Sequence, residues 1–188
     1  SLAIIINDIN RAYSGEKLEP EGYTSYDLAL DNRDALAGDI YKNAENYYKS
    51  VFEHAGGSIS FYPDKNGAAP TAELYHRETR SISVQDVKEF CKKHGITENV
   101  FFISAFGITL GKYNFKKDAV FTTIYHGRND SRLSETVGML VKTLPVFCDF
   151  SGTAKDCLSG VQKQLIDSMN NDIYPFSQIS HEFDIKAD

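Results

Sequence analysis

The spacing of apolar residues predicts helices over most of the chain. Isoleucines recur at helical spacing in residues 1–13, and Gly15 is a suitable helix stop. Residues 16–30 are polar and contain Pro20, so we expect no helix there. A second helical stripe covers residues 34–54 and ends at Gly56-Gly57.

Capping residues mark three further helices. Ser83 with Asp86, and Thr153 with Asp156, are spaced as capping boxes, while Thr97 is a candidate N-cap. The helix after Thr97 is apolar on nearly all sides, which predicts a buried position for its phenylalanines Phe101, Phe102 and Phe106. Pro175 and Phe176 open a last short helix.

Strands are expected over residues 74–81, 119–125 and 140–150, from alternation and from β-branched and aromatic residues. We expect four or five strands in all, and strands that alternate with helices are typical of an α/β fold. Turn-forming residues in 63–72 make the best boundary between two lobes, 1–70 and 71–188.

Composition excludes several classes of protein. The chain has 188 residues, 41% of them hydrophobic, and a net charge of −6 without a cluster of Lys and Arg, so we expect no nucleic-acid partner. No apolar run approaches the roughly 20 residues of a membrane helix, so we expect no membrane partner. The three cysteines include no CxxC pair, which favours buried thiols, a reducing compartment and a cytoplasmic location.

Generic catalytic motifs do not assign a function. The sequence contains no GxSxG, GxxxxGK[ST] or GxGxxG motif. No two of its five histidines lie three or four positions apart, so a metal site is not expected.

Seven segments, in order, resemble motifs of the condensation domains of nonribosomal peptide synthetases. The two most specific are VGMLVKTLP (137–145), which resembles V-G-x-F-V-N-T-L-P, and NDIYPFS (171–177), which resembles H/N-Q-D-Y/V-P-F-E. The other five are the helix of residues 1–13, Tyr26-Asp27-Leu28-Ala29, Tyr47-Tyr48, the apolar helix after Thr97, and Tyr125-His126-Gly127-Arg128.

The resemblance implies a fold and also marks departures from the family pattern. It implies a partial chloramphenicol acetyltransferase-like fold, with a mixed sheet flanked by helices. Lys142 replaces the family's Asn, Ser177 replaces its Glu, and the HHxxxDG motif is not in the sequence. We therefore expect a piece cut just after that motif, with the tail of the N-terminal lobe in 1–70 and most of the C-terminal lobe in 71–188.

The resemblance also implies a reaction. Condensation domains join an acyl thioester and an amine, each carried on the phosphopantetheine arm of a carrier domain. The implied partners are the upstream and downstream peptidyl carrier domains and an adenylation domain, with no cofactor bound to this chain directly. Because the histidine of HHxxxDG is missing, we expect the 188 residues alone to be inactive.

Three candidate residues for the substrate tunnel follow from these motifs. Lys142 is the one cation on an apolar strand face and would contact a thioester carbonyl or an oxyanion, or alternatively extend to solvent. Arg128 would bind the pantetheine phosphate or hold a loop, and the alternative is a structural ion pair. His126 would line the tunnel or form a hydrogen bond at a strand end.

Other motif residues are expected to be structural. Tyr26 and Asp27 would fix the crossing between lobes, Gly138 belongs to the 137–145 motif, and Pro175 and Phe176 would pack at a helix start.

Two alternatives to a catalytic condensation domain stay open: a degenerate module that only docks carrier proteins, and a standalone acyltransferase of the same fold. Epimerisation and cyclisation domains share much of the pattern. Because half of a two-lobe domain exposes apolar surface, we also expect self-association of the fragment.

Overall fold

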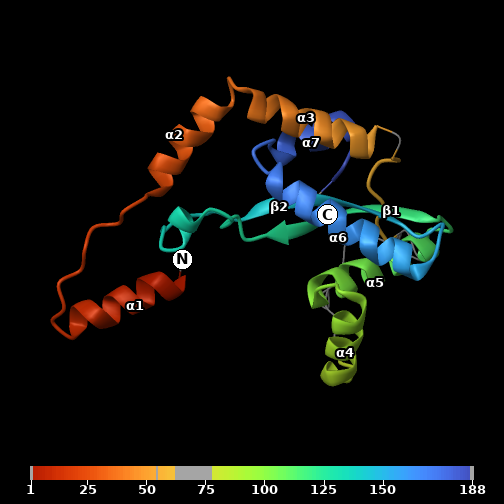
Figure 1. Ribbon diagram of the computed structural model, residues 1–188, viewed down its shortest axis with the longest axis horizontal. Helices are drawn as coiled ribbons and strands as arrows, with labels where there is room; N and C mark the ends of the chain where they lie inside the picture. The colour runs from red at the N-terminus through yellow and green to blue at the C-terminus, as the bar shows by residue number, and fades with distance from the viewer. Residues whose placement is uncertain (1, 54, 62–77, 187–188) are drawn as a thin grey trace, which may run out of the picture.

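The computed structural model describes residues 2–53, 55–61 and 78–186. The described residues form seven α-helices, one short 3₁₀ helix and two strands, shown in Figure 1. In chain order these are α1 (Leu2–Tyr13), α2 (Ser25–Ala35), α3 (Asp39–Phe52), α4 (Val84–His94), α5 (Glu98–Tyr113), β1 (Asp118–Tyr125), η1 (Ser131–Leu133), β2 (Lys142–Asp149), α6 (Ala154–Asn170) and α7 (Phe176–Phe183).

The two strands form an antiparallel pair at the centre of the molecule (Figure 1). Asp118 lies opposite Asp149 at one end of the pair, and Tyr125 lies opposite Lys142 at the other. The predicted strand of residues 119–125 is thus confirmed to within one residue, and the second strand is shorter at both ends than the predicted 140–150.

Each face of the sheet is covered by helices, because side chains alternate between the faces. On one face, strand residues such as Phe121 and Val146 share a core cluster with residues of α5 and α6. On the other face, Val120 and Phe147 pack with residues of α3 and α7. The result is three layers with the apolar core on both sides of the sheet, as expected for an α/β fold.

Side chains and loops cover part of both sheet edges. Gln164 of α6 donates from Nε2 to the Pro145 carbonyl (3.0 Å), and its Oε1 accepts from the backbone N–H of Phe147 (3.1 Å). On the other edge, the Ile59 N–H donates to the Val120 carbonyl (2.9 Å). These bonds satisfy backbone groups that an edge strand would otherwise leave unpaired.

The three predicted N-cap residues are confirmed, but of the two predicted capping boxes only that of Thr153 and Asp156 forms in full. Thr153 and Asp156 form a full capping box, and the side chains of Ser83 and Thr97 accept from Asp86 N–H and Val100 N–H. Gly95 ends α4 with a left-handed conformation.

The prediction of no helix in residues 16–30 is wrong for its second half. The side chain of Thr24 caps α2 and the carboxylate of Asp27 bonds back to the Thr24 N–H, a capping box that starts this helix. The helix expected over 34–54 begins only at Asp39, after the N-cap Gly38.

Other expectations are corrected or lie outside the described residues. Phe102 and Phe106 of α5 are 48% and 46% exposed, so the helix is not buried on all sides in this chain. The described residues hold two strands and not the four or five expected. Most of the predicted strand 74–81 and the lobe boundary lie outside the described residues, and 78–81 are irregular.

The lengths of the helices and the state of the cysteines bear on the class of protein. No described helix combines the length and the apolar character needed to cross a bilayer. Cys91, Cys148 and Cys157 are all buried free thiols, which confirms the expectation drawn from their spacing.

Candidate functional site

An ion pair lies at the end of the sheet where β2 begins. The Lys142 ammonium donates to the backbone carbonyl of Asp172 (3.0 Å) and contacts Oδ1 of the same residue (2.9 Å). Asp172 lies in the turn between α6 and α7, so the pair ties the start of β2 to that turn. The side chains are 29% and 23% exposed, which leaves both partners half-buried.

The pair forms part of the wall of a pocket of about 440 Å³. Its size is within the range of small-molecule sites. Three residues singled out from the sequence, Lys142, Pro175 and Phe176, meet in this pocket. The complete lining comprises Asn32 and Leu36 from the α2–α3 region, Lys142, Thr143 and Leu144 from β2, and Asp172, Ile173, Tyr174, Pro175 and Phe176 from the turn into α7.

The local sequence explains how these residues are held. Pro175 is the N-cap residue of α7 with an extended backbone, and Phe176 packs against the cluster that joins α3 and α7. Tyr174 is buried, and its hydroxyl donates to Glu182 of α7 (2.9 Å). Burial, followed by this bond to Glu182, raises the pKa of the Tyr174 phenol. The wall therefore rests on a packed element.

The hydroxyl of Tyr125 is buried without a hydrogen-bond partner among the described residues. Tyr125 lies directly opposite Lys142 across the sheet and is 4% exposed. Burial raises the pKa of its phenol, and the charge of Asp172 raises it further. The structure thus places a spare O–H donor within electrostatic range of the Asp172 carboxylate.

Arg128 and His126 do not line this pocket. The Arg128 guanidinium donates to the backbone carbonyls of Leu133 and Thr136, which fastens the connection between β1 and β2. His126 is exposed, and its Nδ1 accepts from the Arg128 N–H (3.0 Å), so the neutral ring carries its proton on Nε2. The Arg128 bonds are of the loop-holding kind considered for this residue, and the His126 bond is of the strand-end kind.

Tyr26 and Asp27 lie in the first turn of α2, and Gly138, in the connection between β1 and β2, lies close to that turn. Asp27 accepts from the Thr24 N–H and hydroxyl, and these bonds lower the pKa of its carboxyl. Tyr26 is exposed on the same helix. A Cβ at Gly138 would lie 2.9 Å from the Ser25 Cβ, so only glycine allows this close approach to α2. The close approach of Gly138 to Ser25 packs the connection between the strands against the start of α2.

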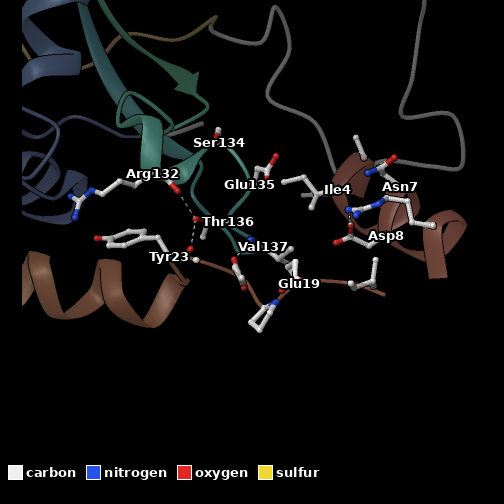
Figure 2. Close-up of a pocket in the computed structure, with 16 residues that line it drawn as sticks. Ile4, Asn7, Asp8, Glu19, Tyr23, Arg132, Ser134, Glu135, Thr136 and Val137 are labelled. Atoms are coloured by element: carbon white, nitrogen blue, oxygen red, sulfur yellow. Dashed lines mark hydrogen bonds and ion pairs between the residues drawn. The ribbon is translucent and has the colours of Figure 1, made fainter. Parts of the chain in front are cut away.

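A larger pocket of about 780 Å³ lies between α1, residues 18–23 and residues 132–137 (Figure 2). Arg132 stacks on the Tyr23 ring (4.4 Å to its centroid) and pairs with Asp130 and Asp31. The hydroxyl of Thr136 donates to the Tyr23 carbonyl (2.6 Å). This bond fixes the loop of residues 132–137 against residues 18–23, which precede α2. Sequence analysis did not identify this pocket, since its walls come from three separate segments.

Asp172 and Tyr125 are the functional candidates that sequence analysis missed. Both belong to motif segments quoted for the resemblance, but Lys142 and Asp172 are 30 positions apart in the sequence, and no local pattern indicates that they pair. The described residues include no group of three or more His, Cys, Asp or Glu side chains that could hold a metal ion.

The sequence of this chain is similar to parts of several peptide and surfactin synthetases. Nonribosomal peptide synthetase sidC of Arthroderma benhamiae is 28% identical over 95% of this chain, and surfactin synthase subunit 1 of Bacillus subtilis is 28% identical over all of it. The chain spans only 3% and 5% of the lengths of these two proteins.

Solved structures share the fold. The first condensation domain of the calcium-dependent antibiotic synthetase superposes with a TM-score of 0.69 at 14% identity, over 92% of this chain and 39% of that one. SgcC5 from Streptomyces globisporus superposes with a TM-score of 0.75 at 20% identity, over 96% and 43%. The chain thus has the fold of part of a condensation domain, which confirms the fold class expected from the resemblance.

The family model described as the condensation domain matches residues 1–188. The chain therefore belongs to the condensation domain family.

Proposed function

We propose that the chain is part of a condensation domain of a nonribosomal peptide synthetase, and that the intact domain forms a peptide bond between two carrier-bound substrates. The observation that carries the proposal is the family match along all 188 residues. The name of one relative, a nonribosomal peptide synthetase, supports the same reaction class.

The proposed reaction is an acyl transfer from sulfur to nitrogen. The amine of the acceptor attacks the thioester carbonyl of the donor, the C–N bond forms, and the C–S bond breaks. The amine loses one proton, and the departing thiolate of the donor's phosphopantetheine arm gains one. Upstream and downstream peptidyl carrier domains would deliver both substrates, and an adenylation domain would load them. Holding the two reactants together supplies much of such a rate gain.

Lys142 is the residue of this chain that we propose to assist the reaction. An ammonium group has three donors, and two of those on Lys142 face Asp172. The third is available to a carbonyl oxygen as negative charge develops on it during attack. Asp172 would hold the ammonium in one orientation, which makes it a positioning residue.

The test uses the intact parent protein with both carrier domains loaded. We expect Lys142→Met to lower the rate of dipeptide formation at least tenfold, and Lys142→Arg to retain more activity than Lys142→Met. Lys163→Met is the matched control, because Lys163 forms an exposed ion pair with Asp167 on α6. A Lys142→Met protein within twofold of the wild type would reject the role of Lys142. No dipeptide from the wild type would reject the peptide-bond reaction itself.

A second candidate is a non-catalytic module that docks other proteins. Two observations favour it: Lys142 stands where the family has Asn, and its charge is neutralised by Asp172. The X-domain of teicoplanin biosynthesis, solved in a complex with OxyB, shares the fold at a TM-score of 0.73 and 15% identity. Carrier-domain binding by the intact protein without any amide product would support this candidate.

A further inference from the structure

The pocket beside the Lys142–Asp172 pair offers a donor and an acceptor side by side. One N–H of Lys142 has no partner among the described residues, since the other two face Asp172. Oδ1 of Asp172 contacts Lys142, and Oδ2 has no hydrogen bond or ion pair within the described parts of the chain. Both residues line the same pocket.

The pair is electrically neutral, and this limits the ligands that suit it. A phosphate or an isolated carboxylate would be attracted by Lys142 and repelled by Asp172 at nearly the same distance. A ligand with an oxygen acceptor and an N–H donor on neighbouring atoms instead satisfies both groups. Half-burial of the pair strengthens these bonds relative to bulk water.

The other residues of the pocket wall favour a ligand that carries an apolar group. The side chains of Leu36, Ile173, Pro175 and Phe176 contribute aliphatic and aromatic surface, and Thr143 and Asn32 contribute neutral polar groups. Lys142 and Asp172 are the charged residues of this lining. A volume of about 440 Å³ is large enough to hold a single amino-acid residue.

The geometry points to a binding pocket for the aminoacyl group of an apolar amino acid, with its carbonyl oxygen on Lys142 and its amino group on Asp172. The side chain of that amino acid would lie against Ile173 and Phe176. This inference rests on the proposed function, because a condensing enzyme must hold an aminoacyl group, and it assigns the specificity to named residues.

Three small probes separate the contacts in a binding titration on the intact parent protein. L-Leucinamide carries the amino group, the carbonyl and the side chain. 4-Methylpentanamide lacks only the α-amino group, and 3-methylbutan-1-amine lacks only the carboxamide. We expect leucinamide to bind at least tenfold more tightly than either analogue, and glycinamide to bind more weakly than leucinamide by a similar factor.

Two variants assign the contacts to residues. We expect Asp172→Asn to remove the preference for leucinamide over 4-methylpentanamide, and Lys142→Met to remove the preference for leucinamide over 3-methylbutan-1-amine. Asp167→Asn, in the exposed ion pair with Lys163 on α6, is the matched control and should leave all affinities unchanged.

The outcomes separate this inference from the proposed function. Undetectable leucinamide binding, or equal affinity for leucinamide and 4-methylpentanamide, would overturn the pocket assignment even if the protein forms dipeptides. Selective binding that depends on Asp172 would uphold the pocket even if no dipeptide is formed, and only the condensation reaction would then be rejected.

Discussion

The side chain of Gln164 forms the hydrogen bond to Phe147 that a neighbouring strand would otherwise form. Its carboxamide oxygen accepts the outward N–H of Phe147, and its NH₂ group serves the Pro145 carbonyl two positions earlier. One side chain of α6 thus completes two hydrogen bonds along the outer edge of β2, and α6 is fixed in register with the sheet.

This contact predicts a large effect of Gln164→Ala on stability. The substitution leaves two backbone groups of β2 without partners, which we expect to lower the free energy of unfolding by about 2–4 kcal/mol. Gln164→Glu should also destabilise, since a carboxylate accepts from Phe147 but cannot donate to Pro145. Urea unfolding followed by circular dichroism measures both. A Gln164→Ala midpoint equal to that of the wild type would contradict the assigned role.

A buried phenol predicts loss of stability at alkaline pH. Burial raises the pKa of Tyr47 to about 12, and its hydroxyl lies 3.0 Å from both the Gln164 carbonyl and Ser168 Oγ. In the unfolded chain the phenol titrates near pH 10. Between these values the unfolded state binds fewer protons than the folded state, so stability is complete below about pH 10 and falls as the pH rises toward 12.

Tyr47→Phe should therefore reduce the slope of stability against pH above about pH 10. Thermal unfolding at stepped pH values, with tyrosine absorbance recorded in parallel, measures the slope. Tyr26→Phe, at an exposed position on α2, is the control. An unchanged slope in Tyr47→Phe would show that this phenol does not contribute.

The backbone conformation and close packing of Gly127 predict that alanine is not tolerated at this position. Its φ is +69°, and an added Cβ would lie 1.8 Å from the Leu140 carbonyl oxygen. Left-handed backbone costs an L-residue about 1–2 kcal/mol before any clash, so Gly127→Ala should destabilise by at least about 2 kcal/mol. Gly160→Ala, in the middle of α6 with open space around its Cα, should instead stabilise by about 0.5–1 kcal/mol. Equal melting temperatures for the two variants would contradict this reasoning.

The exposed apolar face of α1 predicts self-association of the 188-residue chain. No residue of α1 is buried, and Leu2, Ile6 and Ile9 are at least half exposed. Figure 1 shows this helix lying apart from the sheet and its covering helices. We expect sedimentation velocity to show concentration-dependent association, and Ile6→Glu with Ile9→Glu to reduce it.

Ile82→Glu is the control for this experiment, because Ile82 is exposed just before α4 and distant in sequence from α1. A chain that stays monomeric at high concentration would contradict the prediction, and so would an equal effect of Ile82→Glu.

The elements that the sequence predicted well are those with local signals. Thr97 and Thr153 are spaced correctly for helix starts, and both helices begin there. The strand ending at Tyr125 is rich in residues that suit a sheet covered on both sides. Helix α2 was missed because its weak apolar stripe gave no periodic signal, although its capping box, Thr24 to Asp27, was readable.

The candidate site was only half predictable. Lys142 stood out as a cation among apolar strand positions, and Pro175 and Phe176 stood out through the motif. Their meeting in one pocket depends on the packing of α6 and α7 against the sheet, which is a long-range property. The exposure of Phe102 and Phe106 has the same cause, because apolar composition alone does not tell which face of a helix is covered.

The connection between β1 and β2 is held at several points, so its length is fixed by contacts with other parts of the molecule. Its start is clamped by Arg128, its middle is bonded to Tyr23 and Glu21, and its end leads directly into Lys142. Residues of this one segment line the larger pocket, and the strand it feeds lines the smaller one. An insertion or deletion here would reshape both cavities together, so an engineer who wants to alter one pocket alone should leave this segment's length untouched.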